Sequence, residues 1–289
     1  MPERRRTTLR LATVAGLMAA VVACQPAAGQ KMRSVTSARQ LAGERRLDVE
    51  LRYAAGRLTV EPARSNLLYR LDMRYNEERW RPLTEYDRES GRLRLGLENV
   101  RRRGRDDMRS GREDRATIAL SPQVPMALEL EFGAGEAEVE LGGLALEAVD
   151  ISTGASESRI SFSQPNRVAA RTVKISAGAA EIEVEKLGNA RAERFEFKGG
   201  LGEATLDFTG AWSRSARASI EMGVGEVTLR LPRSLGVRIE KDSFLTSFDA
   251  PGMTRRGDAW YSRGYDQARY RLDISIDAAI GSIEIDWVD

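Results

Sequence analysis

Carboxylates are the main candidates for catalysis or metal binding in this chain, because its 289 residues include no histidine and a single cysteine. Without histidine the sequence lacks the commonest general base and the commonest metal ligand. One cysteine excludes an intrachain disulfide and a zinc site built from thiolates. Asp106, Asp107 and Asp114 lie among arginines, and some β-solenoid enzymes work with Asp, Arg and Lys alone. No Ser–His pair, glycine-rich phosphate loop or glycosidase signature accompanies them, so we expect no enzymatic activity and no cofactor.

Glutamates recur at one position of a repeated short turn. They are Glu136, Glu157, Glu181, Glu203 and Glu226. If the repeats stack, like charges ~5 Å apart repel one another, and a hard cation such as Ca²⁺ would relieve the repulsion with oxygen ligands. Alternatively, each glutamate caps its own turn or pairs with Arg and Lys of adjacent loops. The nine-residue calcium-binding repeat with its aspartates is absent, so we expect no metal site.

Aromatic residues gather between positions 232 and 271, which hold a third of the chain's aromatic side chains. They are Phe244, Phe248, Trp260, Tyr261, Tyr265 and Tyr270. An exposed row could stack on sugar rings, with Trp260, Tyr261, Tyr265 and Tyr270 as the candidate binding residues. More often such a cluster covers the open end of a β-stack, where apolar side chains and free strand edges need protection. We therefore expect a cap, with glycan binding as the alternative.

Arginines dominate residues 99–115, which contain seven of them beside four acidic residues. A basic loop of this kind could touch anionic lipid headgroups or phosphorylated wall polymers. The interspersed acids leave only a small net positive charge and few residues are apolar. We expect a solvated insertion.

A repeated unit positions these side chains. Each copy reads apolar-x-apolar, a glycine-containing turn with Glu, then apolar-x-apolar, and the turns begin at residues 133, 154, 178, 200 and 223. The turn residues are Gly133, Gly135, Glu136, Gly154, Glu157, Gly178, Glu181, Gly200, Gly202, Glu203, Gly223, Gly225 and Glu226. Glycine there supplies positive φ or a close backbone approach. We expect Gly200 to have positive φ and therefore not to tolerate a side chain. Gly210, outside the repeated turn, should tolerate alanine better than Gly200 tolerates valine.

The repeats predict an all-β fold. Apolar side chains alternate with polar ones, as at Leu128, Leu130 and Phe132, which is typical of strands buried on one face. A unit of about 22 residues that returns the same turn in register indicates a β-solenoid, similar to a right-handed β-helix, of about seven coils. Weaker copies at residues 47–60 and 272–285 complete the seven. We assign residues 47–115 to an N-terminal β half with the basic loop, and residues 116–289 to the repeat array with a C-terminal cap.

The first residues read as a secretory signal. Arg4, Arg5, Arg6 and Arg10 precede thirteen uncharged residues, Leu11 to Ala23, a stretch too short to span a membrane. It ends Val21-Val22-Ala23-Cys24, which resembles the bacterial lipobox. That resemblance implies a signal peptide over residues 1–23, cleavage before Cys24 and acylation of Cys24. The alternative is an ordinary signal cut nearby that leaves a free thiol.

Residues 24–46 are expected to form a flexible tether, because they are small, polar and charged without a clear apolar period. Gln25 stands where inner-membrane retention usually involves aspartate, so the lipobox resemblance implies the outer membrane, on its periplasmic or surface face. Removal of residues 1–23 leaves 41 basic and 42 acidic side chains. That balance gives no support for nucleic-acid binding.

The array resembles the bacterial toast-rack family. The residues that carry the likeness are Ile118 to Pro122, Val124 to Leu130, the Gly133–Glu136 turn, the Leu141-Gly142-Gly143-Leu144 segment and the later Gly/Ala-rich turns. Such domains are cell-envelope β-solenoids, found in LiaF-type regulators of cell-wall stress and in adhesin-like proteins. Many relatives carry transmembrane helices or follow a cytoplasmic module, whereas this chain has a lipobox.

The resemblance and the lipobox together suggest a lipid-anchored envelope protein. We expect its β-solenoid to act as an adhesin-like or scaffolding module. Its partners would be membrane lipid, through Cys24, and an envelope protein or glycan. The alternative function is regulation or sensing of envelope stress through protein–protein contacts.

Overall fold

Long strands form wherever the sequence alternates apolar and polar side chains, because every second residue then faces a common core. The computed structural model describes residues 31–64, 66–99 and 113–289. These residues form one 15-stranded sheet, and a short 3-10 helix, Leu187–Ala190, lies between the strands Ala170–Glu185 and Ala192–Asp207. The expected signal peptide and Cys24 lie outside the described residues. Within the described part of the chain, no helix is long and apolar enough to cross a membrane.

The strands follow the repeats along the chain. Their bounds are β1 Met32–Gln40, β2 Leu47–Pro62, β3 Leu67–Asn76, β4 Trp80–Asp87, β5 Arg92–Asn99, β6 Arg115–Leu120, β7 Met126–Glu140, β8 Leu146–Ser161, β9 Ala170–Glu185, β10 Ala192–Asp207, β11 Ala216–Pro232, β12 Gly236–Asp249, β13 Met253–Arg256, β14 Ala259–Ser262 and β15 Arg271–Val288.

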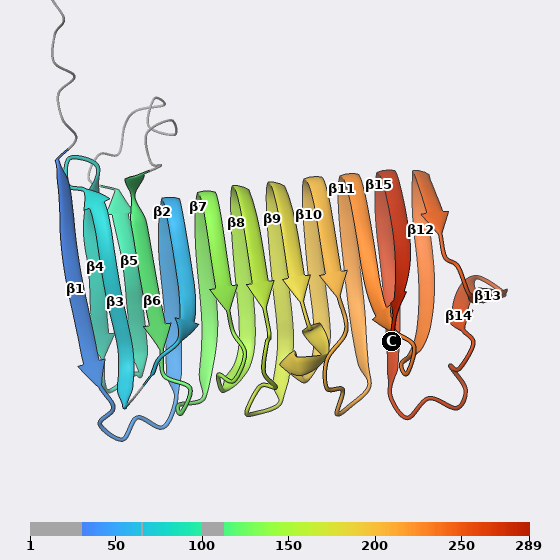
Figure 1. The fold of residues 1–289 in the computed structure, drawn as a ribbon, viewed down its shortest axis with the longest axis horizontal. Helices are drawn as coiled ribbons and strands as arrows, with labels where there is room; N and C mark the ends of the chain where they lie inside the picture. The colour runs from blue at the N-terminus through green and yellow to red at the C-terminus, as the bar shows by residue number, and fades with distance from the viewer. Residues whose placement is uncertain (1–30, 65, 100–112) are drawn as a thin grey trace, which may run out of the picture. The chain divides into compact units, whose positions relative to one another are not determined.

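Seven long strands form a parallel rack, in the order β2, β7, β8, β9, β10, β11, β15 (Figure 1). Each pairs in register with the next, so that equivalent residues of successive repeats are neighbours. These strands are the seven repeats found in the sequence. The prediction of an all-β, solenoid-like fold is confirmed.

Each long strand bends in its middle. On β7, Leu128, Leu130 and Phe132 are buried before the turn, and Ala137 and Val139 after it. The buried positions switch from even to odd across Gly133–Glu136, so both halves of the strand face one core. We call the edge that carries these bends the bend edge, on the upper side in Figure 1, and the edge that carries the connecting segments the loop edge.

Glycine serves two purposes in the β10 bend. A Cβ on Gly200 would lie 2.5 Å from the carbonyl oxygen of Gly178 on the neighbouring strand, so glycine lets the bends stack closely. Gly200 does not have positive φ; that conformation belongs to Gly202, at +122°. The expectation that Gly210 tolerates alanine is wrong, because its φ is +113° and a Cβ would lie 2.9 Å from the backbone nitrogen of Asn189.

The N-terminal end of the rack contains one coil made of two separate strands. β5 pairs with the first half of β2, and β6 pairs with its second half. Most of the arginine-rich insertion, residues 100–112, separates β5 from β6 in the sequence and lies outside the described residues. Because β2 also pairs with β7, the strands from β2 to β6 share one sheet with the array and do not form a separate half.

The tether predicted for residues 24–46 is too long, because residues 32–40 form β1. This strand pairs with β3 in antiparallel register. Among its residues, Val35 packs against the core, so the apolar alternation is too weak to reveal the strand in the sequence. The hydrogen bonds offered by the edge of β3 explain why it forms.

The C-terminal end departs from chain order. The last strand, β15, lies between β11 and β12, so β12 is separated from β11 although it follows directly in sequence. β14 then pairs with β12, and β13 with β14, both antiparallel. These three strands cover the end of the rack.

Candidate functional site

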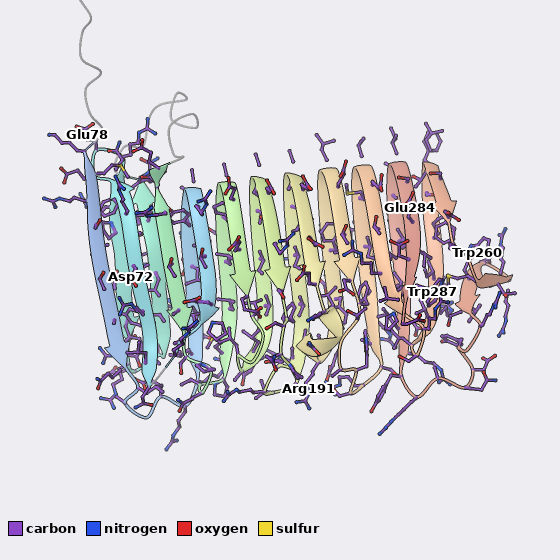
Figure 2. The ribbon with its side chains drawn as sticks, viewed as in Figure 1. Asp72, Glu78, Arg191, Trp260, Glu284 and Trp287 are labelled. Atoms are coloured by element: carbon purple, nitrogen blue, oxygen red, sulfur yellow. The ribbon has the colours of Figure 1, made fainter. Side chains whose placement is uncertain are left out.

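A cavity of about 500 Å³ lies at the C-terminal end of the rack, beside the end of β15 and the segments that follow β12 and β14. This volume is within the range of small-molecule sites. Its walls include Arg233, Pro251, Gly252, Arg263, Ile285 and Trp287. Figure 2 shows Trp287 and Trp260 at this end of the molecule.

Trp287 is held in place from two sides. Its ring packs against the core, and its indole Nε1 donates a hydrogen bond of 2.6 Å to the carbonyl oxygen of Pro251. Arg233 forms an ion pair of 2.8 Å with Asp289, whereas Arg263 makes no ion pair with any described residue. A fixed indole beside a guanidinium can stack on a sugar ring and bind its hydroxyl or acidic groups.

Two other hollows of similar volume lie towards the N-terminal half of the rack. In each of them a basic residue of the lining is paired with an acid, although Arg92, which also lines the second hollow, makes no ion pair with a described residue. Arg52 pairs with Glu131 at 3.4 Å, and Lys174 pairs with Asp150 at 2.8 Å. The C-terminal cavity is the better candidate for a ligand because Trp287 in its wall is only half-buried, whereas Tyr53 and Phe132 in the first of the other hollows are buried and the second has no aromatic side chain in its lining.

Among the predicted aromatic residues, Trp260 and Phe248 pack edge to face, with ring centroids 5.5 Å apart, and both rest on the core. Tyr261 and Tyr265 form a second pair at 5.0 Å. Guanidiniums lie over several rings: Arg256 over Tyr261, Arg271 over Tyr265 and Arg269 over Tyr270.

The ring of Trp260 thus contacts Phe248, and the rings of Tyr261, Tyr265 and Tyr270 contact one another or arginines, an arrangement that resembles the expected cap more than an open stacking row. Phe244 does not belong to this cap, because it is 85% exposed at the bend edge.

Sequence reasoning missed Trp287 because it follows Ile283 and Ile285 in the alternation of buried residues and therefore resembles a core position. It stays half-buried because it lies at the end of the last strand. The signal that could have found it is its size: a tryptophan continues a strand whose buried side chains are aliphatic.

The five repeated glutamates do form a column. Glu136, Glu157, Glu181, Glu203 and Glu226 are successive register partners at the bend edge. At the N-terminal end of the column Arg57 donates two hydrogen bonds to Glu136, of 2.7 and 3.0 Å. Within the described ranges, no group of three or more acidic or cysteine side chains is arranged to hold a metal ion.

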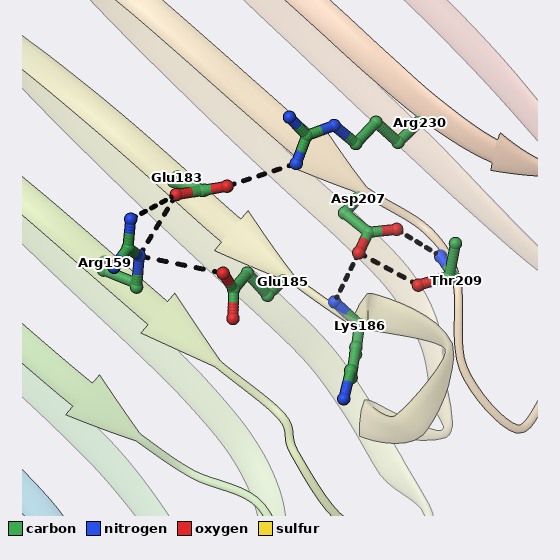
Figure 3. A network of polar contacts seen from close by, with 7 residues as sticks. All are labelled: Arg159, Glu183, Glu185, Lys186, Asp207, Thr209 and Arg230. Atoms are coloured by element: carbon green, nitrogen blue, oxygen red, sulfur yellow. Dashed lines mark hydrogen bonds and ion pairs between the residues drawn. The ribbon is translucent and has the colours of Figure 1, made fainter. Parts of the chain in front are cut away.

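Charged pairs also link strands of the rack to their first or second neighbours on its outer surface (Figure 3). Arg159 of β8 contacts Glu183 of β9 at 2.8 Å, and Arg230 of β11 reaches the same carboxylate at 3.2 Å. These side chains are partly exposed, so each pair stabilises the fold little.

Asp114 is the one described member of the three aspartates considered for catalysis; Asp106 and Asp107 lie outside the described residues. It is 2% exposed, and its carboxylate accepts hydrogen bonds from the Trp80 indole at 2.9 Å and the Asn76 backbone N–H at 2.8 Å. Burial raises the pKa of the Asp114 carboxyl, opposed by these two hydrogen bonds. Both oxygens therefore have a structural task beside the interrupted coil.

Comparison with known proteins gives a family and a set of similar folds. A family model described as the N-terminal domain of toast_rack, DUF2154, matches residues 27–185 and 172–230. A "putative cell adhesion protein" from Clostridium sporogenes ATCC 15579 is 19% identical, with a TM-score of 0.49, over 89% of this chain and 100% of that chain. A "putative adhesin" from Bacteroides fragilis NCTC 9343 is 12% identical, with a TM-score of 0.41, over 88% of this chain and 97% of that chain. No curated protein matches.

Proposed function

This chain belongs to the toast_rack family, and we propose that it is a lipid-anchored protein of the bacterial cell envelope whose β-solenoid is an adhesin-like or scaffolding binding module. The lipobox-like sequence before Cys24 supports the anchor. The C-terminal cavity supports the binding role. The proposal assigns the chain no catalytic activity, no cofactor and no nucleic-acid partner.

The observation that carries the proposal is the separation of the two ends of the rack. The described chain starts at β1, at one end of the strand order, and the cavity lies beside β15, nine strands further along. At ~4.8 Å per strand this is about 43 Å. A protein tethered through residues 24–30 can thus hold its cavity well away from the attachment point.

We propose a glycan of the cell wall or of a cell surface as the ligand class for the cavity. Trp287 offers a ring for stacking, and Arg263 offers donors that are not used in an ion pair with a described residue. The outer membrane is the proposed location, on the strength of Gln25 after the lipobox.

Acylation is tested by replacing Cys24 with alanine in the full chain. We expect the parent to incorporate a palmitate analogue and the Cys24→Ala variant to incorporate none. Equal incorporation in parent and variant would contradict the lipid anchor.

Binding is tested with the processed chain and isolated cell-wall sacculi in a pull-down. Trp287→Ala should lower the affinity about tenfold or more, as loss of an aromatic anchor does. Trp212→Ala is the matched control, because its half-buried indole also packs on the core and donates to a backbone carbonyl, that of Phe208, at 2.7 Å.

Equal loss of binding in both tryptophan variants would show that the cavity is not the site. A parent that binds no glycan, but crosslinks in intact cells to a membrane protein of the same envelope, would favour the role in stress sensing instead.

A further inference from the structure

The large apolar residues that are exposed in the described part of the chain all lie together at the bend edge. They are Leu201 (55% exposed), Val224 (42%), Phe244 (85%), Leu245 (62%) and Ile280 (48%). Leu201, Val224, Ile280 and Leu245 are successive register partners on β10, β11, β15 and β12, and Phe244 precedes Leu245. We call these five residues the apolar ridge.

The ridge is not required by the bend itself. The same register position on the earlier strands carries alanine, at Ala55, Ala134, Ala155 and Ala179. The bends therefore form equally well with a methyl group. The change from alanine to leucine, valine and isoleucine adds exposed apolar surface at one end of the edge only, and such patches mark contact surfaces.

The described chain also starts at the bend edge. Met32, the first residue of β1, pairs with Asn76 of β3. Two residues earlier on β3, Arg74 pairs with Arg115 of β6. Arg115 in turn pairs with Arg57, the residue after the bend glycine Gly56. The seven residues from Cys24 to Gln30 can span at most about 25 Å, so an anchor at Cys24 holds this edge close to the bilayer.

We propose that the apolar ridge inserts into the surface of a lipid bilayer and gives the lipid-anchored rack a second membrane contact. The inference rests on the proposed lipid anchor, which makes the bend edge the edge nearest the membrane. From β1 to the ridge is about 34 to 48 Å along the edge, so the two contacts hold the rack lengthwise on the bilayer. The loop edge then faces away from the membrane.

The charges around the ridge favour a lipid bilayer over a second copy of the chain as the partner of the ridge. Glu203 and Glu226 lie two residues after the ridge positions of β10 and β11, and Asp277 and Asp242 lie three residues before those of β15 and β12. Two ridges of separate copies in contact would bring these carboxylates together. A row of side chains about 14 Å long is also far too small for a stable dimer. A zwitterionic bilayer accepts the apolar side chains without repelling the acids.

The test uses the processed full chain reconstituted in phosphatidylcholine vesicles. Cys24 is the only native cysteine, and acylation would consume its sulfur, so an introduced Leu245→Cys can be labelled alone with an environment-sensitive fluorophore. Ala169→Cys, exposed on the segment between β8 and β9 at the loop edge, is the matched control. We expect lipids brominated in their acyl chains to quench the label at position 245 and to leave that at 169 unchanged.

Flotation of the unacylated Cys24→Ser chain with the same vesicles separates the ridge from the anchor. The double variant Phe244→Ser, Leu245→Ser should reduce its lipid partitioning tenfold or more, with an unchanged melting temperature because both side chains are exposed. Adding phosphatidylglycerol should not strengthen binding.

Absence of quenching at 245 in a chain that is acylated would overturn the membrane contact and leave the anchor standing. Absence of acylation, with flotation that still depends on Phe244 and Leu245, would overturn the anchor and leave the ridge. Self-association in the absence of vesicles that is lost in the double variant would show that the occupant is a second copy, and would refute the proposal.

Discussion

Asn166 should be among the positions of the loop edge where a substitution lowers stability most. Its buried amide provides the hydrogen bonds that link its own segment to the start of β8 and to the 3-10 helix. The side chain is 1% exposed. Its Oδ1 accepts from the N–H of Leu146 at 2.8 Å, and its Nδ2 donates to the carbonyls of Leu146 at 2.8 Å and Ala190 at 3.2 Å. One amide thus joins the start of β8 to the 3-10 helix before β10.

Asn166→Ala removes all three hydrogen bonds at once. Each is worth about 1 kcal/mol net, and a buried group left without a partner costs about 1–3 kcal/mol. We therefore expect the free energy of unfolding to fall by about 3–5 kcal/mol, measured as a lower urea midpoint by circular dichroism. Gln164→Ala, an exposed residue of the same segment, should change stability by less than about 0.5 kcal/mol.

Asn166→Asp sharpens the test. A carboxylate can still accept from Leu146 N–H, but it faces the two carbonyls without a proton to donate. We expect this variant to be at least as unstable as Asn166→Ala at neutral pH, and to regain stability as the pH falls and the buried carboxyl is protonated. An Asn166→Ala protein as stable as the parent would refute the reasoning, because water would then satisfy the three backbone groups.

Three further changes test other parts of the structure. Trp260→Ala should cost about 2–3 kcal/mol, since the ring is half-buried and loses its contact with Phe248; a urea midpoint equal to that of the parent would remove Trp260 from the cap. Gly200→Ala should lower the stability by about 1–3 kcal/mol, because its Cβ would press on the Gly178 carbonyl. Gly264→Ala, with open space around it, should leave the melting temperature unchanged. Equal shifts in the melting temperature of the two variants would mean that the bends can separate freely. The pKa of the Asp114 carboxyl is raised in the folded state. The carboxyl therefore ionises first in the unfolded chain, and its contribution to stability falls as the pH rises from the pKa of the unfolded state, near 3.8, through that of the folded state. Urea titrations at several pH values should show this loss in the parent, and an identical profile in Asp114→Asn would show that another group causes it.

The sequence was informative wherever one repeat constrains the next. Glycines and glutamates recur at equivalent positions because each bend must stack on the bend before it, so the register of Glu136, Glu157 and Glu181 could be predicted without coordinates. The same argument fails where a strand depends on a distant neighbour. β1 has a single partly buried apolar residue against the core, Val35, and forms on the edge offered by β3.

The candidate site was harder to predict for the same reason. Trp260 was found as part of a local cluster, but the cavity beside Trp287 depends on where β15 lies, and nothing in its sequence separates a strand added at the end from one inserted beside β11. The apolar ridge was also missed, because Leu201, Val224, Leu245 and Ile280 each resemble an ordinary strand residue in isolation. Their exposure becomes evident only when the bend places all four at one edge.

The position of β15 fixes an order of events during biosynthesis. β12 is made before β15, yet it pairs with β15 and not with β11, so until β15 has been made β12 has no parallel partner beside the rack. A nascent chain therefore presents β11 as an open edge until β15 has been made and has paired with it. Chains that lack β15 would expose that edge permanently, which makes β15 the strand on which completion and solubility of the whole rack depend.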